Sequence, residues 1–196
     1  MKKIKLMLFS GSLMMLAACQ STQMTQPEQW QTQRPEQNFD ASGRLGVKIN
    51  EKGSYANFDW SRQNGVETID VNTPVGNTVG QLCRDKLGVL AKDANGKIYT
   101  ADTPEALSEQ LLGYNLPIEH MATWANGEWV PNEPHHFNAQ GKLQQLGWTI
   151  SRELNEDNTP RILLLENAQM SIRMAFTHFE TTQTQPESPT QCTARN

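Results

Sequence analysis

Residues 39–49, with the sequence FDASGRLGVKI, contain the pattern that decides the fold. Counting from Phe39, every second position holds an apolar residue or a glycine, and polar residues such as Asp40, Arg44 and Lys48 occupy most of the positions between. Successive side chains of a strand point to opposite faces of a sheet. The alternation therefore predicts a strand with one buried face and one face in water.

The same alternation returns along the chain, separated by turn signals. Asn64-Gly65 favours a hairpin because both residue types tolerate the positive φ of a tight turn, and Asn95-Gly96 repeats this signal. Strands at this spacing, joined by tight turns, predict an antiparallel meander. The further expected strands cover residues 56–60, 67–71, 78–82, 87–91, 97–100, 144–150, 162–165 and 170–178.

Two short helices interrupt the predicted strands. Residues 102–105, DTPE, combine a capping residue, an early proline and a glutamate in the first turn, and Gly113 ends this helix. Residues 118–125 carry apolar side chains at helical spacing. These helices can cover only part of the apolar face of so long a sheet. Two packed sheets, a closed barrel, or a curled half-barrel with helices in its mouth would each bury that face, and the periodicity fits all three.

The first nineteen residues have the layout of a secretory signal. Three lysines precede an apolar run over residues 6–18, and the small residues Ala17 and Ala18 lie directly before Cys19. A small residue before cysteine resembles the bacterial lipobox, which implies a signal peptide over residues 1–18 and lipidation of Cys19. The alternatives are an ordinary signal peptide and, less favoured, a membrane-spanning anchor, since thirteen helical residues reach about 20 Å of a core about 30 Å thick. By the same resemblance, Gln20 rather than aspartate implies sorting to the outer membrane, facing the periplasm.

Polar segments flank the predicted folded domain, residues 39–180. Residues 19–38 are rich in glutamine and predict a lipid-anchored tether, in which Trp30 is interpreted as the start of a short docking helix. Residues 181–196 are polar and contain proline, which predicts a disordered tail. Cys83 and Cys192 are able to pair in an oxidising periplasm, but the expectation is that a bond from a strand to such a tail does not form.

Charge and motifs exclude several classes of function. The formal net charge is -4, and removal of the three lysines in residues 1–18 leaves 14 basic against 21 acidic residues, or -7. Nucleic acid, whose phosphates require a basic face, is therefore not an expected partner. The sequence has no G-x-S-x-G, phosphate-binding glycine loop or H-E-x-x-H motif, and His135-His136 lacks a spaced metal ligand. We expect no enzyme activity, no catalytic residue, no cofactor and no metal.

Residues 73–77, TPVGN, place a valine in a connection where polar residues are usual. Val75 lies between Pro74 and Gly76, and two interpretations remain open. Its side chain either packs back on the rim of the sheet or projects from a rigid corner as an apolar probe for a membrane or a ligand.

Seven short segments occur in a specific order over residues 39–179, behind the lipobox. They are FDASGRL (39–45), ANFDW (56–60), NTPVG (72–76), YTAD (99–102), LGYNLP (112–117), WANG (124–127) and QLGW (145–148). In order and spacing they resemble the LolB family of outer-membrane lipoproteins. Two features depart from that family's pattern: the loop tip carries valine where leucine is more frequent, and the tail beyond Phe179 is longer.

The resemblance implies the half-barrel. The expected fold is mainly β, a curled antiparallel sheet that forms an incomplete barrel with a helical lid, shared with the soluble periplasmic chaperone LolA. It also implies a monomer that accepts lipoproteins from LolA, holds their acyl chains in an apolar cavity and inserts them into the outer membrane. The alternative on the same fold is a periplasm-facing lipoprotein that carries a glycolipid or phospholipid.

Two sets of candidate site residues follow from this resemblance together with the strand pattern. Pro74, Val75 and Gly76 form the expected membrane-insertion loop. The alternative for every member of the second set is ordinary core packing. The expected acyl-chain cavity is lined by Leu45, Val47, Phe58, Trp60, Ile69, Val71, Leu111, Trp124, Trp148, Met174 and Phe176.

Overall fold

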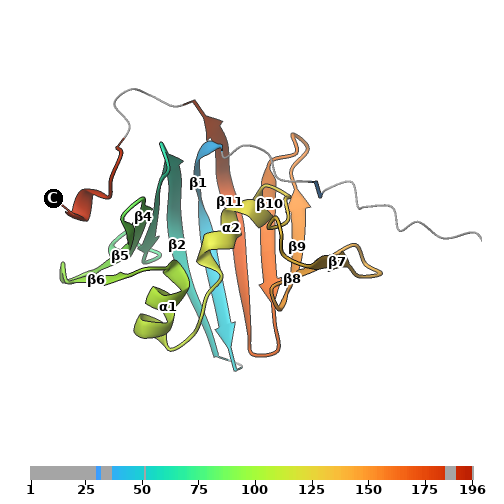
Figure 1. Ribbon diagram of the computed structural model, residues 1–196, viewed down its shortest axis with the longest axis horizontal. Helices are drawn as coiled ribbons and strands as arrows, with labels where there is room; N and C mark the ends of the chain where they lie inside the picture. The colour runs from blue at the N-terminus through green and yellow to red at the C-terminus, as the bar shows by residue number, and fades with distance from the viewer. Residues whose placement is uncertain (1–29, 32–36, 51, 184–188, 196) are drawn as a thin grey trace, which may run out of the picture.

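The computed structural model describes residues 30–31, 37–50, 52–183 and 189–195, so the predicted signal peptide and Cys19 lie outside the described residues. Within those ranges, eleven strands form one antiparallel sheet that does not close, and two helices cover one of its faces (Figure 1). The predicted incomplete barrel with a helical lid is therefore confirmed. No helix in the described part of the chain is long and apolar enough to cross a bilayer.

The strands follow one another as a meander, except where the two ends of the domain meet. Their order across the sheet is β6-β5-β4-β3-β2-β1-β11-β10-β9-β8-β7. The strands are β1 (Asn38–Ile49), β2 (Lys52–Gln63), β3 (Val66–Asn72), β4 (Thr78–Asp85), β5 (Gly88–Asp93), β6 (Ile98–Ala101), β7 (His135–Phe137), β8 (Leu143–Gln145), β9 (Trp148–Leu154), β10 (Pro160–Glu166) and β11 (Met170–Thr182). The helices are α1 (Pro104–Leu112), α2 (Ile118–Ala125) and the short 3₁₀ helix η1 (Thr193–Arg195).

The pairing of β1 with β11 joins the two halves of the sheet. It runs from Asn38 opposite Thr182 to Ile49 opposite Met170, with a register shift beside Gly43. A Cβ at Gly43 would overlap the backbone oxygen of Ala175. Glycine is therefore required at this position of the fold-deciding stretch, because the two backbones approach too closely for any side chain.

Tight turns and caps form largely where the sequence predicts them. Asn64 and Gly65 adopt positive φ between the paired residues Gln63 and Val66, as expected for a two-residue hairpin. Thr103 caps α1 by accepting a hydrogen bond from the Ala106 N–H (3.1 Å). Gly113 then ends α1 in the left-handed conformation.

The predicted single strand over residues 144–150 is wrong, because a hairpin divides it into β8 and β9. Leu146 and Gly147 form the two-residue turn, both with positive φ, between the paired residues Gln145 and Trp148. Leucine rarely adopts this conformation, and the alternation of apolar residues continues through the turn, so the sequence does not reveal it. His135 and His136 lie in a strand, β7.

The two faces of the sheet are covered differently. We call the face that carries α1 and α2 the inner face; Phe58 and Trp60 of β2 point to it and belong to the main buried cluster. Aromatic side chains dominate this cluster, for example the edge-to-face pair of Phe39 and Trp60, whose ring centroids lie 5.0 Å apart. The opposite, outer face carries Asp59 and the residues in register with it.

Trp30 is not the start of a helix, in contrast to the prediction. Its side chain is buried in the main cluster, and Gln31 forms an isolated parallel bridge with Glu128. The backbone N–H of Gln31 donates to the carbonyl of Gly127 (2.9 Å). The side chain of Trp30 and the backbone of Gln31 therefore dock this part of the predicted tether on the domain.

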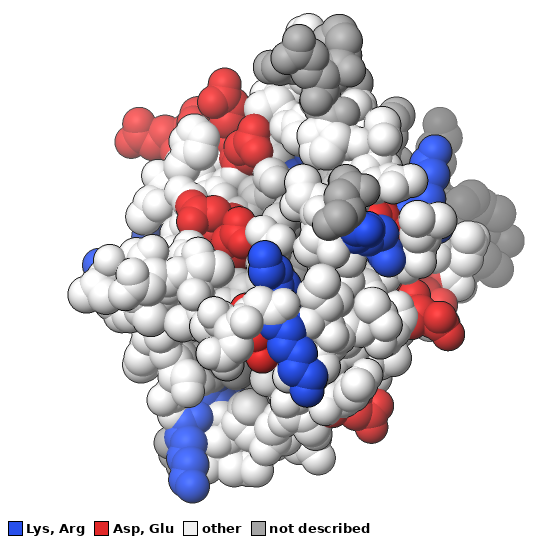
Figure 2. Space-filling model, turned by 90° about the vertical axis from the view of Figure 1, so that its left-hand side faces the viewer, with Lys and Arg blue, Asp and Glu red and all other residues white. Residues whose placement is uncertain are grey.

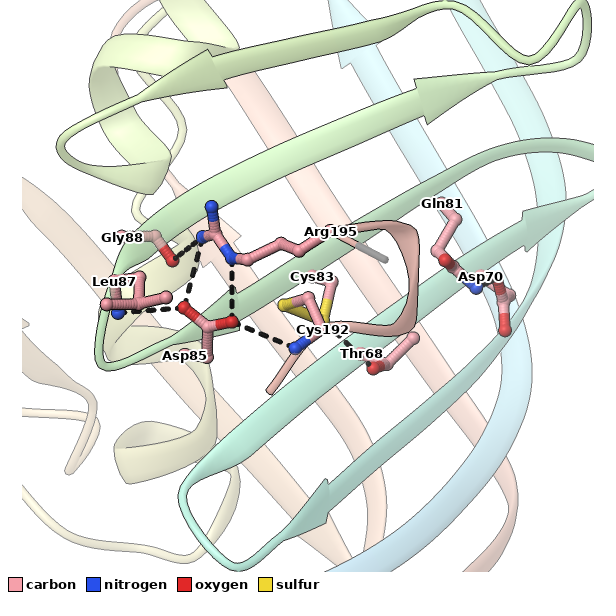
Figure 3. Close-up of a disulfide and its surroundings, with 9 residues drawn as sticks. All are labelled: Thr68, Asp70, Gln81, Cys83, Asp85, Leu87, Gly88, Cys192 and Arg195. Carbon is pink, nitrogen blue, oxygen red and sulfur yellow. Dashed lines mark hydrogen bonds and ion pairs between the residues drawn. A yellow bond between two sulfur atoms is a disulfide. The ribbon is translucent and has the colours of Figure 1, made fainter. Parts of the chain in front are cut away.

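The C-terminal segment, residues 189–195, lies against the outer face of β3–β5, so the prediction of disorder is wrong for these residues. Cys192 forms a disulfide with Cys83 of β4, contrary to expectation (Figure 3). The Cys192 N–H and the Arg195 guanidinium both donate to the Asp85 carboxylate, at 2.8 Å each. Composition predicts a solvated tail, but it does not reveal these partners, which lie more than a hundred residues away in sequence.

A small apolar cluster explains what the C-terminal segment covers. Val66, Leu90 and Cys83 are buried on the outer face beneath Cys192, with Ala194 packed against them. Without the segment this apolar patch would face water. The disulfide thus fixes a cover over the outer face of β3–β5.

Removal of the disulfide should destabilise the domain without unfolding it. In the double variant Cys83→Ser, Cys192→Ser the unfolded chain is no longer cross-linked over 109 residues, and the free energy of unfolding should fall by about 2–4 kcal/mol. Chemical denaturation of the oxidised protein and the variant measures this difference. A reductant should lower the stability of the wild type to that of the variant and leave the variant unchanged. Equal stabilities of the oxidised wild type and the variant would show that the bond contributes nothing.

The Asp85 clamp should make stability depend on acid pH. Burial raises the pKa of Asp85, but hydrogen bonds from Arg195 and from the N–H groups of Cys192 and Leu87 outweigh burial and hold the pKa below its ordinary value of 3.8. Because the folded protein binds this proton less readily than the unfolded chain, the contribution is complete above 3.8 and is lost as the pH falls through the lowered pKa. The stability difference between wild type and Asp85→Asn should therefore shrink in acid. A difference that stays constant from neutral pH into strong acid would contradict this linkage.

Candidate functional site

The Val75 loop, residues 73–77, connects β3 to β4 and presents an apolar tip. Val75 is 83% exposed, so the interpretation that it packs on the rim of the sheet is wrong. Pro74 and Gly76 beside it are also exposed. Of the large apolar side chains in the described residues, only Tyr55 is equally exposed. An exposed side chain here contributes little apolar burial to the fold.

Hydrogen bonds close the Val75 loop into a tight turn. The N–H of Thr73 donates to the carbonyl of Asn77 (2.8 Å), and the N–H of Gly76 donates to the carbonyl of Thr73 (2.9 Å). The hydroxyl of Thr73 accepts from the Asn77 N–H (3.1 Å). Gly76 has a φ of 91°, which favours glycine. The loop is thus a closed corner with valine at its tip.

Side chains below the loop fix its base. Asn72 is buried; its amide donates to Asp59 (2.8 Å) and accepts from the Thr78 hydroxyl (2.8 Å). A polar hollow of about 740 Å³ lies beside this base on the outer face and extends to the turn between β5 and β6. Figure 2, which views the end of the molecule that carries β4–β6, shows acidic and basic groups interspersed with uncharged surface. The base of the loop therefore borders a polar hollow.

Most of the predicted acyl-chain residues lie together on the inner face. Leu45, Val47 and Ile69 are partly buried and pack against the main cluster. Val71 is half-buried, and Leu111 is 38% exposed; neither belongs to that cluster. The members within the buried cluster are Phe58, Trp60, Trp124, Trp148, Met174 and Phe176.

α1 buries a different leucine from the one predicted. Leu107 is fully buried, whereas Leu111 and Leu112 are exposed. The spacing of the three leucines places them on one side of the helix, but α1 packs mainly against β5, β6 and α2 and buries a narrow part of that side. The sequence predicts the apolar stripe but not how much of it the sheet covers.

A buried carboxylate links the inner face to the lid, and the sequence analysis did not identify it. Glu67 is 3% exposed and accepts from the Trp60 indole N–H (2.8 Å), Arg62 (2.8 Å) and Arg84 (2.7 Å). Arg84 also lies 3.6 Å from Glu119 of α2. One carboxylate thus orients the indole of Trp60 and connects three strands to a helix of the lid.

The sequence of the hairpin contains the pattern that identifies Glu67 as part of a buried ion pair. Arg62 and Glu67 lie opposite each other across the Asn64-Gly65 turn. They share the face of Trp60, because each is two residues away from Trp60 or from its register partner Ile69. Opposite charges placed on an otherwise apolar face predict a buried pair.

A buried amide connects the lid to the other half of the sheet. Gln145 of β8 accepts from the indole N–H of Trp124 in α2 (3.1 Å) and from the N–H of Val130 (2.8 Å), and its own amide donates to the Val130 carbonyl (2.8 Å). The side chain of Gln145 is buried. α2 is therefore tied by polar side chains to β4 on one side and to β8 on the other.

The described residues contain no group of three or more His, Cys, Asp or Glu that could hold a metal ion. His135 instead stacks on Trp129, with ring centroids 4.5 Å apart. The side chain thus has a packing role at the β7 edge of the sheet.

These features define a class: an open β half-barrel with a helical lid and a projecting apolar loop. The family model described as "Outer membrane lipoprotein LolB" matches residues 37–178. The chain belongs to the LolB family of outer-membrane lipoproteins, and its outer-membrane localisation follows from that membership.

Two relatives agree with this assignment. Over 183 residues the chain is 42% identical to "Outer-membrane lipoprotein LolB" of Neisseria meningitidis serogroup A / serotype 4A, covering 93% of this chain and 94% of that protein. A protein of the same name from Chromobacterium violaceum is 31% identical over 81% of this chain and 90% of its own length. A crystal structure of a LolA superfamily protein from Nitrosomonas europaea covers 78% of this chain and 90% of its own, with a TM-score of 0.46 and 7% identity.

Loss of the Glu67 charge should destabilise the inner face. In Glu67→Gln the buried Arg62 loses an adjacent counter-charge, and the free energy of unfolding should fall by about 3–5 kcal/mol. Chemical denaturation measures this change. The control is Glu153→Gln, which breaks an ion pair with Arg161 whose side chains are both about half exposed and should cost less than about 1 kcal/mol. Similar losses in the two variants would contradict a special role for Glu67.

Proposed function

We propose that this protein accepts lipoproteins from the periplasmic chaperone LolA, holds their acyl chains against its inner face and inserts them into the outer membrane. The single observation that carries the proposal is Val75, an aliphatic side chain that is 83% exposed at the tip of a closed turn. Membership of the LolB family and the open half-barrel support it. No step of this transfer requires a catalytic residue.

The cargo sets the physical requirement. A buried acyl CH₂ contributes about 0.8 kcal/mol, so a chain of about fifteen carbons is held with about 12 kcal/mol. Lipoproteins that carry such chains need a continuous apolar environment between carrier and bilayer. The direction of handover is then set by which protein's apolar site binds the acyl chains more tightly. Such a transfer needs no nucleotide.

The inner face offers that environment in two parts. Leu45, Val47 and Ile69 are only partly buried, so an acyl chain can make first contact with them. Behind them, Met174 and Met121 belong to the buried cluster, and methionine repacks around irregular ligands more readily than branched residues do. An acyl chain would thus contact these partly buried side chains first and then displace packing contacts of the lid.

The Val75 loop would provide the contact with the bilayer. Val79, near the start of β4, is also exposed. A short apolar tip can enter the lipid interface, while the acidic domain, which has a formal charge of -7 after loss of residues 1–18, stays in water. Lipidation of Cys19 would keep the protein at the same membrane and raise the efficiency of delivery.

A transfer assay tests this function. The mature protein is mixed with LolA loaded with a lipoprotein and with liposomes, and the lipoprotein bound to each component is measured over time. Val75→Glu should accept the lipoprotein normally and fail to release it to liposomes, because a carboxylate does not enter the lipid interface. Val75→Leu should release it at least as well as the wild type.

Tyr55→Glu is the matched control, since Tyr55 has the same exposure of 83%. It should accept and release cargo as the wild type does. Cys19→Ala should accept cargo but deliver it less efficiently. Release that is normal in Val75→Glu, or lost equally in Tyr55→Glu, would contradict the role of the loop. Failure of the wild type to take lipoprotein from LolA, with binding of a glycolipid or phospholipid instead, would overturn the proposed function.

A further inference from the structure

Trp30 is buried in the half-barrel although it comes from outside it. The half-barrel begins with β1 at Asn38, and Trp30 precedes it in the glutamine-rich segment. The side chain is nevertheless 3% exposed and belongs to the main buried cluster on the inner face. A segment that only connects a lipid anchor to a domain requires no such residue.

The niche that Trp30 fills lies between the end of α2 and strands β7–β9. Its ring centroid is 6.3 Å from that of Phe137 in β7. The guanidinium of Arg152 in β9 lies over the ring, at 5.6 Å, and donates to the carbonyl of Ala125 at the end of α2 (3.0 Å). The niche is therefore continuous with the cluster that contains Trp124, Leu143 and Trp148.

The strand ladders do not depend on Trp30. β1 pairs with β2 and with β11 along its whole length, whereas the docked segment contributes an isolated bridge between Gln31 and Glu128. Removal of Trp30 from its niche would leave every ladder of the sheet in place. It would, however, open a site at one end of the lid, lined by Phe137, the main cluster and the Arg152 guanidinium.

We propose that this niche is a subsite for an acyl chain of the cargo and that Trp30 occupies it when no cargo is bound. The proposal rests on the proposed function and specifies where on the inner face one chain binds. In the protein without cargo, the Trp30 side chain fills the niche and excludes water. An acyl chain is also apolar, and it competes with Trp30 for the same space. The affinity for an acyl chain is then reduced by the fraction of molecules in which Trp30 is docked.

Displacement of Trp30 also changes the reach of the anchor. Trp30 lies eleven positions after Cys19 and Asn38 lies nineteen positions after it, so release of Trp30 lengthens the segment between the anchor and the first attached residue. At about 3.6 Å per residue, the upper limit on this distance rises from about 40 Å to about 68 Å. Entry of cargo would thus allow the domain to move further from the point where it is anchored.

Two variants of Gln31 test the proposal without altering any side chain of the cluster. Gln31→Pro removes the N–H that donates to Gly127 and should release Trp30, while Gln31→Ala keeps the N–H and serves as its control. Both are made in the full chain carrying Cys19→Ala, so that no bilayer or detergent competes. The probe is a fluorescent peptide with an S-diacylglyceryl cysteine, and its Kd is measured by fluorescence anisotropy.

Gln31→Pro should bind the probe at least about threefold more tightly than Gln31→Ala, which should match the protein with Gln31. Trp30→Ala should behave as Gln31→Pro does. The exposure of Trp30 is measured by ¹⁹F NMR of protein labelled with fluorotryptophan, in which the Trp30 resonance is the one that Trp30→Phe removes. Addition of the probe should expose this resonance to solvent, seen as a solvent isotope shift. The resonance of the fully buried Trp124 should show no such shift.

The outcomes separate this proposal from the proposed function. Equal affinities of Gln31→Pro and Gln31→Ala, or a Trp30 resonance that stays shielded when the probe saturates the protein, would overturn the subsite and leave acyl-chain binding intact. Failure of every variant to bind the probe would overturn both. If Trp30→Ala does not fold, the Gln31 pair and the NMR measurement decide alone.

Discussion

An open sheet that curls leaves an apolar face that cannot remain in water, and the rest of this structure depends on covering it. A closed barrel would hide that face with its own strands. Here β6 and β7 end the sheet without meeting, so other segments take over that role. On the inner face these are α1, α2 and Trp30, and on the outer face of β3–β5 the C-terminal segment covers a smaller apolar patch.

The covers of the two faces are held by different kinds of interaction. The C-terminal segment is fixed covalently through Cys83 and Cys192 and by two donors to Asp85. The lid is held by side-chain contacts, such as Trp124 with Gln145 and Arg84 with Glu119. Side-chain contacts open and close at far lower cost than a disulfide. The face on which cargo is proposed to bind is therefore the one whose cover can move.

The sequence predicts a strand correctly where one of its faces is buried and the other is in water. Alternation identifies β1, β2 and β11 because one face is buried and the other is wet along most of their length. It fails at Leu146, where the alternation continues through a turn. It also fails for Cys192, because a polar composition contains no information about a distant partner. The charged residue Glu67 was missed because its partners are revealed only when the register of the hairpin is worked out.

The candidate site was predictable in kind but not in detail. An aliphatic residue in a turn signals a contact, yet a Pro-Val-Gly corner can turn its side chain inward or outward, and local sequence does not distinguish the two. The hydrogen bonds between Thr73 and Asn77 decide the matter, because they close the turn beyond the last strand pair and leave Val75 no neighbouring strand to pack on. A closed turn on a buried base, Asn72, can carry an apolar tip into an interface without distorting the sheet. The turn joins β3 and β4, the strands that hold Glu67 and Arg84 beneath the lid.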